Sequence, residues 1–259
     1  MELKEVFIMS KEIKINQILA NTKNHGGVRD IDKIKYIVVH WTANKTDLAF
    51  SNANYFKNNI VKSSAHYFVD NHAIYQSVKD NVIAWSVGGK KYLFSKGGKM
   101  YGVINNSNSI NIELCCNNGD FLEETIDNAV FLIKKLMKKY NIPYTNIYRH
   151  YDVTGKVCPK PFVGDKNEKR WADFKTKCNE CLDSDIPNCI NVNSQKKYIK
   201  WLQTKLNKIN IKGMDKLKVD GIYGNKTKEY VIAVWKYWGW KPSTGNGIGK
   251  KTITKLKQI

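Results

Sequence analysis

Short apolar segments recur between Ile34 and Cys158 and indicate a domain of alternating strands and helices. Each segment is rich in β-branched or aromatic residues and is bounded by polar or glycine-containing stretches, which is typical of buried strands. The five segments are Tyr36 to His40, Ser64 to Val69, Ile74 to Val78, Ser109 to Cys115, and Ile147 to His150. Because helix-like spacing falls between them, we expect an α/β domain.

The clearest helix is predicted from Thr125 to Tyr140. Lysines occupy one face, and Asn141-Ile-Pro143 marks the end. Its other face carries apolar residues at helical spacing, namely Ile126, Ala129, Val130, Ile133, Leu136, Met137 and Tyr140.

Two stretches lack any sustained period. Ser86 to Ser107, with two Gly-Gly pairs, is predicted to be a long loop, and long loops beside a catalytic sheet commonly line a substrate groove. Residues 166–193 mix charged residues with Asn and Pro, so we expect a linker there. The predicted organisation is a catalytic domain over residues 9–165, the linker, and a C-terminal domain over residues 194–259.

The C-terminal segment contains a weak internal repeat. Gly221-Ile-Tyr-Gly-Asn-Lys-Thr227 resembles Gly247-Ile-Gly-Lys-Lys-Thr252, and in both copies a glycine-turned loop leads into a helix-like run. We therefore expect a small all-α domain of three helices, with tryptophans in the core by default. Its predicted core residues are Ile199, Leu202 and Leu206, then Val231, Val234 and Trp238, then Ile253 and Leu256.

Charge indicates an anionic partner. The formal net charge is +20, and residues 194–259 supply +13 of it, with 16 lysines against 3 acidic residues. A nucleic acid, a membrane surface and an acidic cell-wall polymer would each fit this charge, which alone does not choose among them.

Neither an export signal nor a membrane span is predicted. The apolar run Val6-Phe-Ile-Met9 is too short for a signal peptide, so we expect synthesis in the cytoplasm and no stable membrane insertion. Six cysteines in 259 residues do not suggest a disulfide framework. Cys178, Cys181 and Cys189 hint at a structural metal site but lack a fourth ligand nearby, and unpaired linker thiols are the favoured interpretation.

Three residues could form a catalytic metal site. His150 and Cys158 are close in sequence, and His40 ends the apolar run Tyr36-Ile-Val-Val-His40. Catalytic zinc commonly takes three protein ligands and leaves a fourth position to water. Spacing alone is weak support, because isolated histidines and cysteines are more often packed residues than ligands.

The chain resembles the zinc-dependent N-acetylmuramoyl-L-alanine amidases that share a fold with peptidoglycan recognition proteins and many phage endolysins. The resemblance covers about residues 34–161, and its motifs occur in the family's order. They are Ile37-Val-Val-His40-Trp-Thr, Ser64-Ala-His-Tyr-Phe-Val-Asp70, Ile83-Ala-Trp85-Ser-Val-Gly-Gly89, Ser109-Ile-Asn-Ile-Glu-Leu114 and Arg149-His-Tyr-Asp-Val-Thr-Gly-Lys-Val-Cys-Pro159. The tail is similar to a three-helix peptidoglycan-binding module, through Asp220 to Thr227.

This resemblance implies a mixed central sheet flanked by helices and cleavage of the amide between N-acetylmuramic acid and L-alanine. It places Zn²⁺ on His40, His150 and Cys158, a catalytic glutamate at Glu113 and a catalytic lysine at Lys156. The implied partner is peptidoglycan, with anionic wall polymers as a further partner. Ser86 is a departure, because many relatives carry His there, and it puts contacts in the substrate groove in doubt.

Each remaining candidate has a competing structural interpretation. Glu113 lies in an otherwise apolar strand, where burial would raise its pKa into the range for acid–base work, but a strand Glu could also serve in a salt bridge. Lys156 could stabilise an oxyanion or be a solvated loop lysine. His66 and Trp85 are candidate substrate contacts, although a hydrogen-bonded structural role is favoured for His66. Asp152 could orient a ligand histidine or cap the loop.

Three functions follow from these observations. The favoured one is a cell-wall hydrolase of the phage or prophage endolysin type, which reaches the wall after release, and a bacterial autolysin or sporulation-associated amidase is the related alternative. A non-catalytic peptidoglycan receptor on the same fold would have lost a zinc ligand, whereas this chain keeps all three. A nucleic-acid-binding protein would suit the charge, but no nucleic-acid motif is present.

Overall fold

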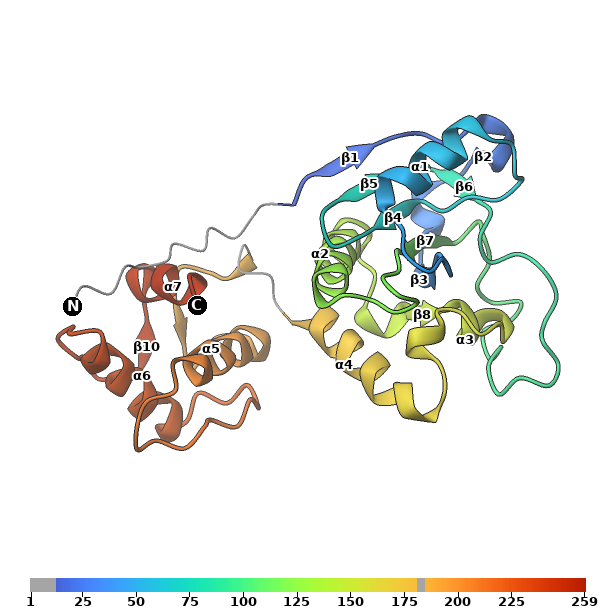
Figure 1. Cartoon of the computed structure of the whole chain (residues 1–259). Helices are drawn as coiled ribbons and strands as arrows, with labels where there is room; N and C mark the ends of the chain where they lie inside the picture. The colour runs from blue at the N-terminus through green and yellow to red at the C-terminus, as the bar shows by residue number, and fades with distance from the viewer. Residues whose placement is uncertain (1–12, 181–184) are drawn as a thin grey trace. The chain divides into compact units, whose positions relative to one another are not determined.

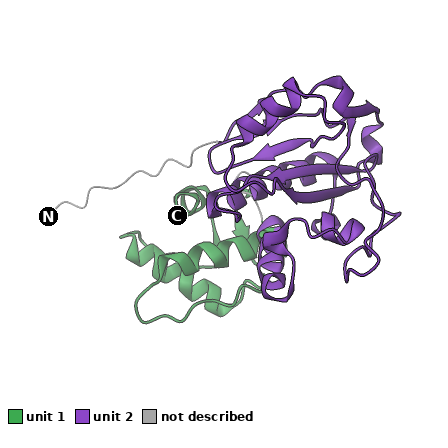
Figure 2. Ribbon diagram, turned by 45° about the vertical axis from the view of Figure 1, so that its right-hand side comes forward, with its two compact units in different colours: residues 1–11, 180–259 green, residues 12–179 purple. Residues whose placement is uncertain are grey.

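The chain forms two compact units in the computed structural model, which describes residues 13–180 and 185–259. One unit comprises residues 12–179, and the other includes residues 180–259 (Figures 1 and 2). The segment Val6 to Met9 and Cys181, both considered above, lie outside the described residues.

A six-stranded mixed sheet forms the centre of the first unit, in the order β1-β5-β4-β7-β3-β8 (Figure 1). Neighbouring strands are parallel, except that β4 and β5 are antiparallel. The strands are β1 (Ile15–Gln17), β3 (Tyr36–Trp41), β4 (Tyr67–Val69), β5 (Ile74–Gln76), β7 (Ser109–Leu114) and β8 (Ile147–Arg149). A separate antiparallel pair consists of β2 (His25–Val28) and β6 (Val82–Ala84).

Four α-helices belong to the described part of this unit: α1 (Ala49–Asn58), α2 (Glu123–Tyr140), α3 (His150–Thr154) and α4 (Glu168–Asn179). Short 3-10 turns occur at Thr22–Asn24, Ile31–Lys33, Tyr144–Asn146, Lys160–Phe162 and Asp165–Asn167. The expected α/β class, the mixed sheet and the flanking helices are therefore confirmed.

Alternation along the strands divides the sheet into two faces. On one face, Ile37, Ile112 and Leu114 pack in the main core with residues of α2 and α4. On the other face, Phe68 packs with Ala49 and Ala53 of α1, while Val38 packs with Val153 of α3 and with the long loop. His40 lies two positions after Val38, so its side chain belongs to this second face.

All five predicted strands are present; four have shorter bounds than expected, and β3 extends one residue further, to Trp41. The segment expected to begin at Ser64 is a strand only from Tyr67. Before Tyr67, the Ser64 backbone N–H bonds the Trp85 carbonyl oxygen, and the His66 backbone N–H bonds the Asn111 carbonyl oxygen. His150, expected to end a strand, begins α3 instead. All of residues 86–107 are described, and neither helix nor strand occurs among them, as predicted.

The prediction of a linker over residues 166–193 is wrong for its first half. Helix α4 occupies Glu168–Asn179, and its buried residues Trp171, Phe174 and Cys178 join the main core. These residues recur at spacings of three and four, which is the helical period. The catalytic unit therefore extends beyond residue 165, to Asn179.

The C-terminal unit contains the three expected helices, α5 (Lys196–Ile209), α6 (Asn225–Tyr237) and α7 (Lys250–Lys257). It is not entirely α-helical, because β9 (Ile190–Asn191) pairs with β10 (Gly247–Ile248). Ile190 is fully buried in this unit's core, so the unit begins before residue 194. The predicted core residues are buried, except that Trp238 is only partly covered.

The first glycine loop of this unit is held by a buried glutamine. Gly221 has a φ of 79°, and a Cβ there would lie 2.9 Å from the Lys196 carbonyl oxygen, so only glycine fits. The side chain of Gln203 accepts a hydrogen bond from the Gly221 N–H and donates to the Ile222 carbonyl and the Asp220 carboxylate. The loop is thereby fixed against α5.

Candidate active site

Parallel strands bring the candidate residues to one edge of the sheet. In the register of β3 and β7, His40 is paired with Glu113, and Val39 is paired with Arg149 of β8. His150 follows Arg149 directly, so it emerges beside His40. Side chains at the carboxyl ends of parallel strands commonly form binding sites in this way.

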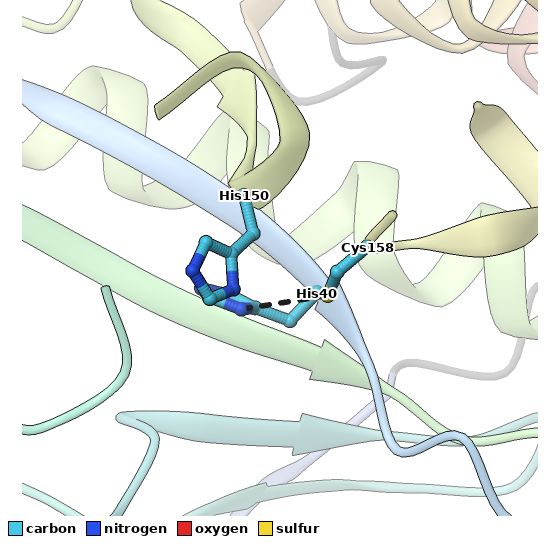
Figure 3. Close-up of side chains that lie close together, drawn as sticks. All are labelled: His40, His150 and Cys158. Carbon is cyan, nitrogen blue, oxygen red and sulfur yellow. Dashed lines mark hydrogen bonds between the residues drawn. The ribbon is translucent and has the colours of Figure 1, made fainter. Parts of the chain in front are cut away.

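The three predicted metal ligands converge (Figure 3). One nitrogen from each of His40 and His150 and the sulfur of Cys158 all lie within 4.8 Å of one another. Cys158 Sγ is 3.8 Å from His40 Nδ1, and the two imidazole rings are 4.8 Å apart at their centroids. All three residues are buried.

The loop that carries Cys158 folds back onto α3. Tyr151 donates its backbone N–H to the Cys158 carbonyl, and Gly155 closes the helix with a φ of 86°. A Cβ at Gly155 would lie 2.8 Å from Ser95 Cβ of the long loop. Glycine at this position therefore lets the ligand loop and the long loop pack together.

Burial changes the protonation of these three donor residues. It lowers the pKa of His150 to about 4 and holds the pKa of His40 well below its usual value, so both imidazoles are neutral and can donate a lone pair. Burial also raises the pKa of the Cys158 thiol, which favours the neutral form unless a cation is present. Two imidazoles and one thiol form a donor set that suits zinc.

Glu113 extends beside this donor set. Its Oε1 lies 3.9 Å from His40 Nδ1, and its buried Oε2 has no hydrogen-bond partner within residues 13–180 and 185–259. Burial raises the pKa of Glu113 to about 8, with Lys156 acting in the opposite direction. A carboxyl group with one oxygen that no other group holds is suited to exchange protons.

A cavity of about 310 Å³ opens onto these groups. Glu113, the three donor residues and Lys156 all line it, and Lys156 is itself exposed. Other walls come from α1, from residues 63–65 and from the segment after β6, and include Asn52, Phe56, Ser64, Trp85 and Ser86. Trp85 thus lies where a substrate contact is expected.

His66 does not reach the cavity, so the prediction of a substrate contact there is wrong. It is fully buried; its Nδ1 accepts the Asn111 backbone N–H at 3.0 Å, and its Nε2 lies 3.0 Å from the Val82 carbonyl oxygen. The competing interpretation, a hydrogen-bonded structural histidine, is the one observed.

Asp152 caps α3 and does not orient a ligand. Its carboxylate accepts the Arg149 backbone N–H and pairs with the Arg149 guanidinium at 2.8 Å. Arg149 also bonds the Phe162 carbonyl and pairs with Glu168 of α4. Sequence reasoning missed Arg149 in this role, which ties α4 to the start of the ligand loop.

Asn111 was also missed, and its side chain contacts His40, one of the three candidate metal ligands. His40 Nε2 lies 3.1 Å from Asn111 Oδ1, and Asn111 is fully buried. Strand alternation could have found it, because Asn111 lies two residues before Glu113 in an otherwise apolar strand and so shares its face.

Comparison with known families identifies the family of the chain. The family model of N-acetylmuramoyl-L-alanine amidases matches residues 30–161, slightly more than half of the chain. The chain belongs to this family. The matched region of the amidase contains all three donor residues, Glu113 and Lys156.

Alignments with curated relatives cover more of this chain than the family model does. A probable N-acetylmuramoyl-L-alanine amidase of Bacillus licheniformis is 28% identical over 254 residues, which cover 91% of this chain and 69% of the relative. The amidase CwlH of Bacillus subtilis is 33% identical over 214 residues, which cover 76% of this chain and 79% of CwlH.

Solved structures match the catalytic unit. The catalytic domain of XlyA aligns with a TM-score of 0.52 at 31% identity, covering 64% of this chain and 99% of that domain. An endolysin from Bacillus subtilis, solved as a mutant, aligns with a TM-score of 0.52 at 32% identity, covering 64% of this chain and 99% of its own. The mixed sheet and its flanking helices are thus the fold of solved endolysin amidases.

Proposed function

We propose that this amidase is a zinc-dependent peptidoglycan hydrolase that cleaves the amide between the lactyl group of N-acetylmuramic acid and L-alanine. The observation that carries the proposal is the convergence of His40, His150 and Cys158 within 4.8 Å beside Glu113, whose Oε2 has no hydrogen-bond partner among the described residues. A receptor that only binds peptidoglycan would need neither feature.

His40, His150 and Cys158 would hold the zinc ion. When bound, zinc supplies a Lewis acid that polarises the amide carbonyl and lowers the pKa of water in its neighbourhood. The buried Cys158 thiolate would be costly alone, so this ligand would be stabilised by a cation held between the three donors.

Glu113 acts as the proton carrier. Its carboxylate removes a proton from the attacking water while the water oxygen forms a bond to the carbonyl carbon. As the C–N bond breaks, Glu113 returns that proton to the alanine nitrogen, so the products are a lactyl carboxylic acid and a free amine. The raised pKa of about 8 suits a group that must both accept and release a proton near neutrality.

Lys156 stabilises charge on the amide oxygen. Its ammonium lines the cavity that Glu113 and the donors share, and it is exposed enough to meet a substrate. A cation fixed where negative charge develops lowers the barrier to formation of the tetrahedral species. Trp85, on the cavity wall, offers a flat apolar surface to the substrate.

The C-terminal unit anchors the enzyme to the wall. Residues 194–259 carry a net charge of +13, which attracts anionic wall polymers, and the glycine loop held by Gln203 provides a rigid surface for peptidoglycan. The match to the Bacillus licheniformis relative spans 91% of the chain, so the likeness extends into this unit. The described residues include no helix long and apolar enough to cross a membrane.

We assign the enzyme an endolysin role, in which it acts on the wall after release from the cytoplasm. Support comes from the solved structures that match its catalytic unit, one of which is named an endolysin from Bacillus subtilis.

Metal analysis tests the zinc assignment. Purified wild-type protein should hold about one zinc per chain. Cys158→Ser should lose most of the metal and the lytic activity, whereas Cys189→Ser, a matched change at an exposed cysteine of the other unit, should alter neither. Full zinc occupancy in Cys158→Ser would refute the ligand set.

A further inference from the structure

A chain of hydrogen bonds runs from the end of the long loop to His40. Ser109 donates its hydroxyl proton to the Asn105 carbonyl at 2.7 Å. Asn111 Nδ2 lies 3.4 Å from Ser109 Oγ, and Asn111 Oδ1 lies 3.1 Å from His40 Nε2. Ser109 and Asn111 are both fully buried, so water does not replace either partner.

The first bond sets the direction of the others. A serine hydroxyl has one proton, and Ser109 donates it to the Asn105 carbonyl oxygen, which can only accept. Ser109 Oγ therefore faces Asn111 as an acceptor, which turns the amide NH₂ of Asn111 toward Ser109. The amide oxygen of Asn111 then faces His40, and an oxygen there requires a proton on Nε2.

A neutral imidazole carries one proton, so a proton on Nε2 leaves Nδ1 with a free lone pair. Nδ1 is the nitrogen that faces Cys158 Sγ, at 3.8 Å, and Glu113 Oε1, at 3.9 Å. With the opposite tautomer, an N–H would point at the position where the metal must bind. The hydrogen-bond chain thus selects the ligand-competent form before any metal arrives.

We propose that Asn111 is the positioning residue of this centre, holding His40 as the Nε2–H tautomer through the chain Asn105–Ser109–Asn111. This inference rests on the proposed zinc function. It gives β7 two tasks at adjacent positions of one face, since Asn111 orients a ligand and Glu113 carries the proton.

The use of an amide here has a chemical consequence. Ligating histidines often donate their second N–H to a carboxylate, which strengthens the ligand. In this centre the Cys158 thiolate and Glu113 already supply negative charge, and a further anion would make the metal a weaker Lewis acid. Asn111 fixes the tautomer without adding that charge.

The tautomer can be read on metal-free protein. Long-range ¹H–¹⁵N correlation spectra should show His40 with a protonated Nε2 and an unprotonated Nδ1 in the wild type. Detection of His40 as the Nδ1–H form would overturn the inference, and this measurement needs no variant to fold.

Zinc affinity, measured by competition with a chelator, tests the role in metal binding. Asn111→Leu should weaken zinc binding roughly ten- to a hundredfold, as loss of a partner of a ligating histidine typically does. Asn111→Asp should bind zinc at least as tightly as wild type but turn over more slowly. Ser109→Ala should have a smaller effect than Asn111→Leu, because it removes only the bond that directs the amide.

Asn128→Leu is the matched control. Asn128 is also a buried asparagine of the same unit, and its amide bonds the Asp70 carbonyl, outside the site. This variant should lose stability but keep wild-type zinc affinity. Unchanged affinity in a folded Asn111→Leu would overturn the inference. A wild type that holds the Nε2–H tautomer yet binds no zinc would overturn the proposed function and leave the tautomer assignment standing.

Discussion

Replacement of Phe174 by alanine should strongly destabilise the catalytic unit, although this residue lies in a segment that looks like a linker in the sequence. Phe174 is 2% exposed and lies in an aromatic cluster, with ring centroids 5.1 Å from Phe162 and 5.5 Å from Trp171. Truncation of a buried phenylalanine to alanine costs about 3–5 kcal/mol, and contacts between aromatic rings add to the burial term. We therefore expect a loss of about 4 kcal/mol in the free energy of unfolding.

The measurement must separate this unit from the C-terminal one. Hydrogen exchange followed by mass spectrometry in a urea series does so, because peptides from α2 and β7 report only on the catalytic unit. Thr176→Ala, on the exposed side of the same helix, is the control and should change stability by no more than about 0.5 kcal/mol. A loss below about 1 kcal/mol for Phe174→Ala, similar to the control, would show that α4 contributes little to the core.

Three further predictions concern the site, acid stability and the tail. Glu113→Gln should keep zinc and fold while wall lysis falls roughly a hundredfold or more, and near wild-type turnover would show that the carboxyl is structural. Burial lowers the pKa of His66 to about 3, so the folded state binds fewer protons than the unfolded state between pH 3 and 6.5 and stability falls as the pH drops through that window. In His66→Gln, urea unfolding across that window should show a pH slope smaller by about 1.4 kcal/mol per unit, and an unchanged slope would contradict this. The full chain should bind purified walls better than residues 1–179 alone, and part of this binding should survive high salt. Complete loss of binding at moderate salt would show that the tail binds walls through its positive charge alone.

Regular periodicity made much of the fold predictable. Strands β3 and β7 and helix α2 follow regular apolar patterns, and the tail helices do the same. Helix α4 was missed because charged and polar residues surround its three apolar positions, so the average composition resembles a linker. The spacing of Trp171, Phe174 and Cys178 does indicate a helix, but the residues around them are polar.

The candidate site was also predictable only in part. The donors His40 and His150 were predictable because each follows an apolar strand pattern, and Cys158 because it lies close to His150 in sequence. The contact of Asn111 with His40 was missed, although strand alternation places Asn111 on the same face as Glu113. The contact of Arg149 with Glu168 was missed because Glu168 lies on α4, a helix that was not predicted. His66 was misplaced because residue type does not reveal whether a side chain faces a cavity or a backbone carbonyl.

Identification of the bond that the enzyme cuts tests the central claim most directly. Purified peptidoglycan would be digested with zinc-loaded wild type and with Glu113→Gln, and the products labelled at new amino termini and new reducing ends. Wild type should release amino-terminal alanine without new reducing sugars, and Glu113→Gln should release almost none. New reducing ends, or new amino termini on another residue, would contradict it.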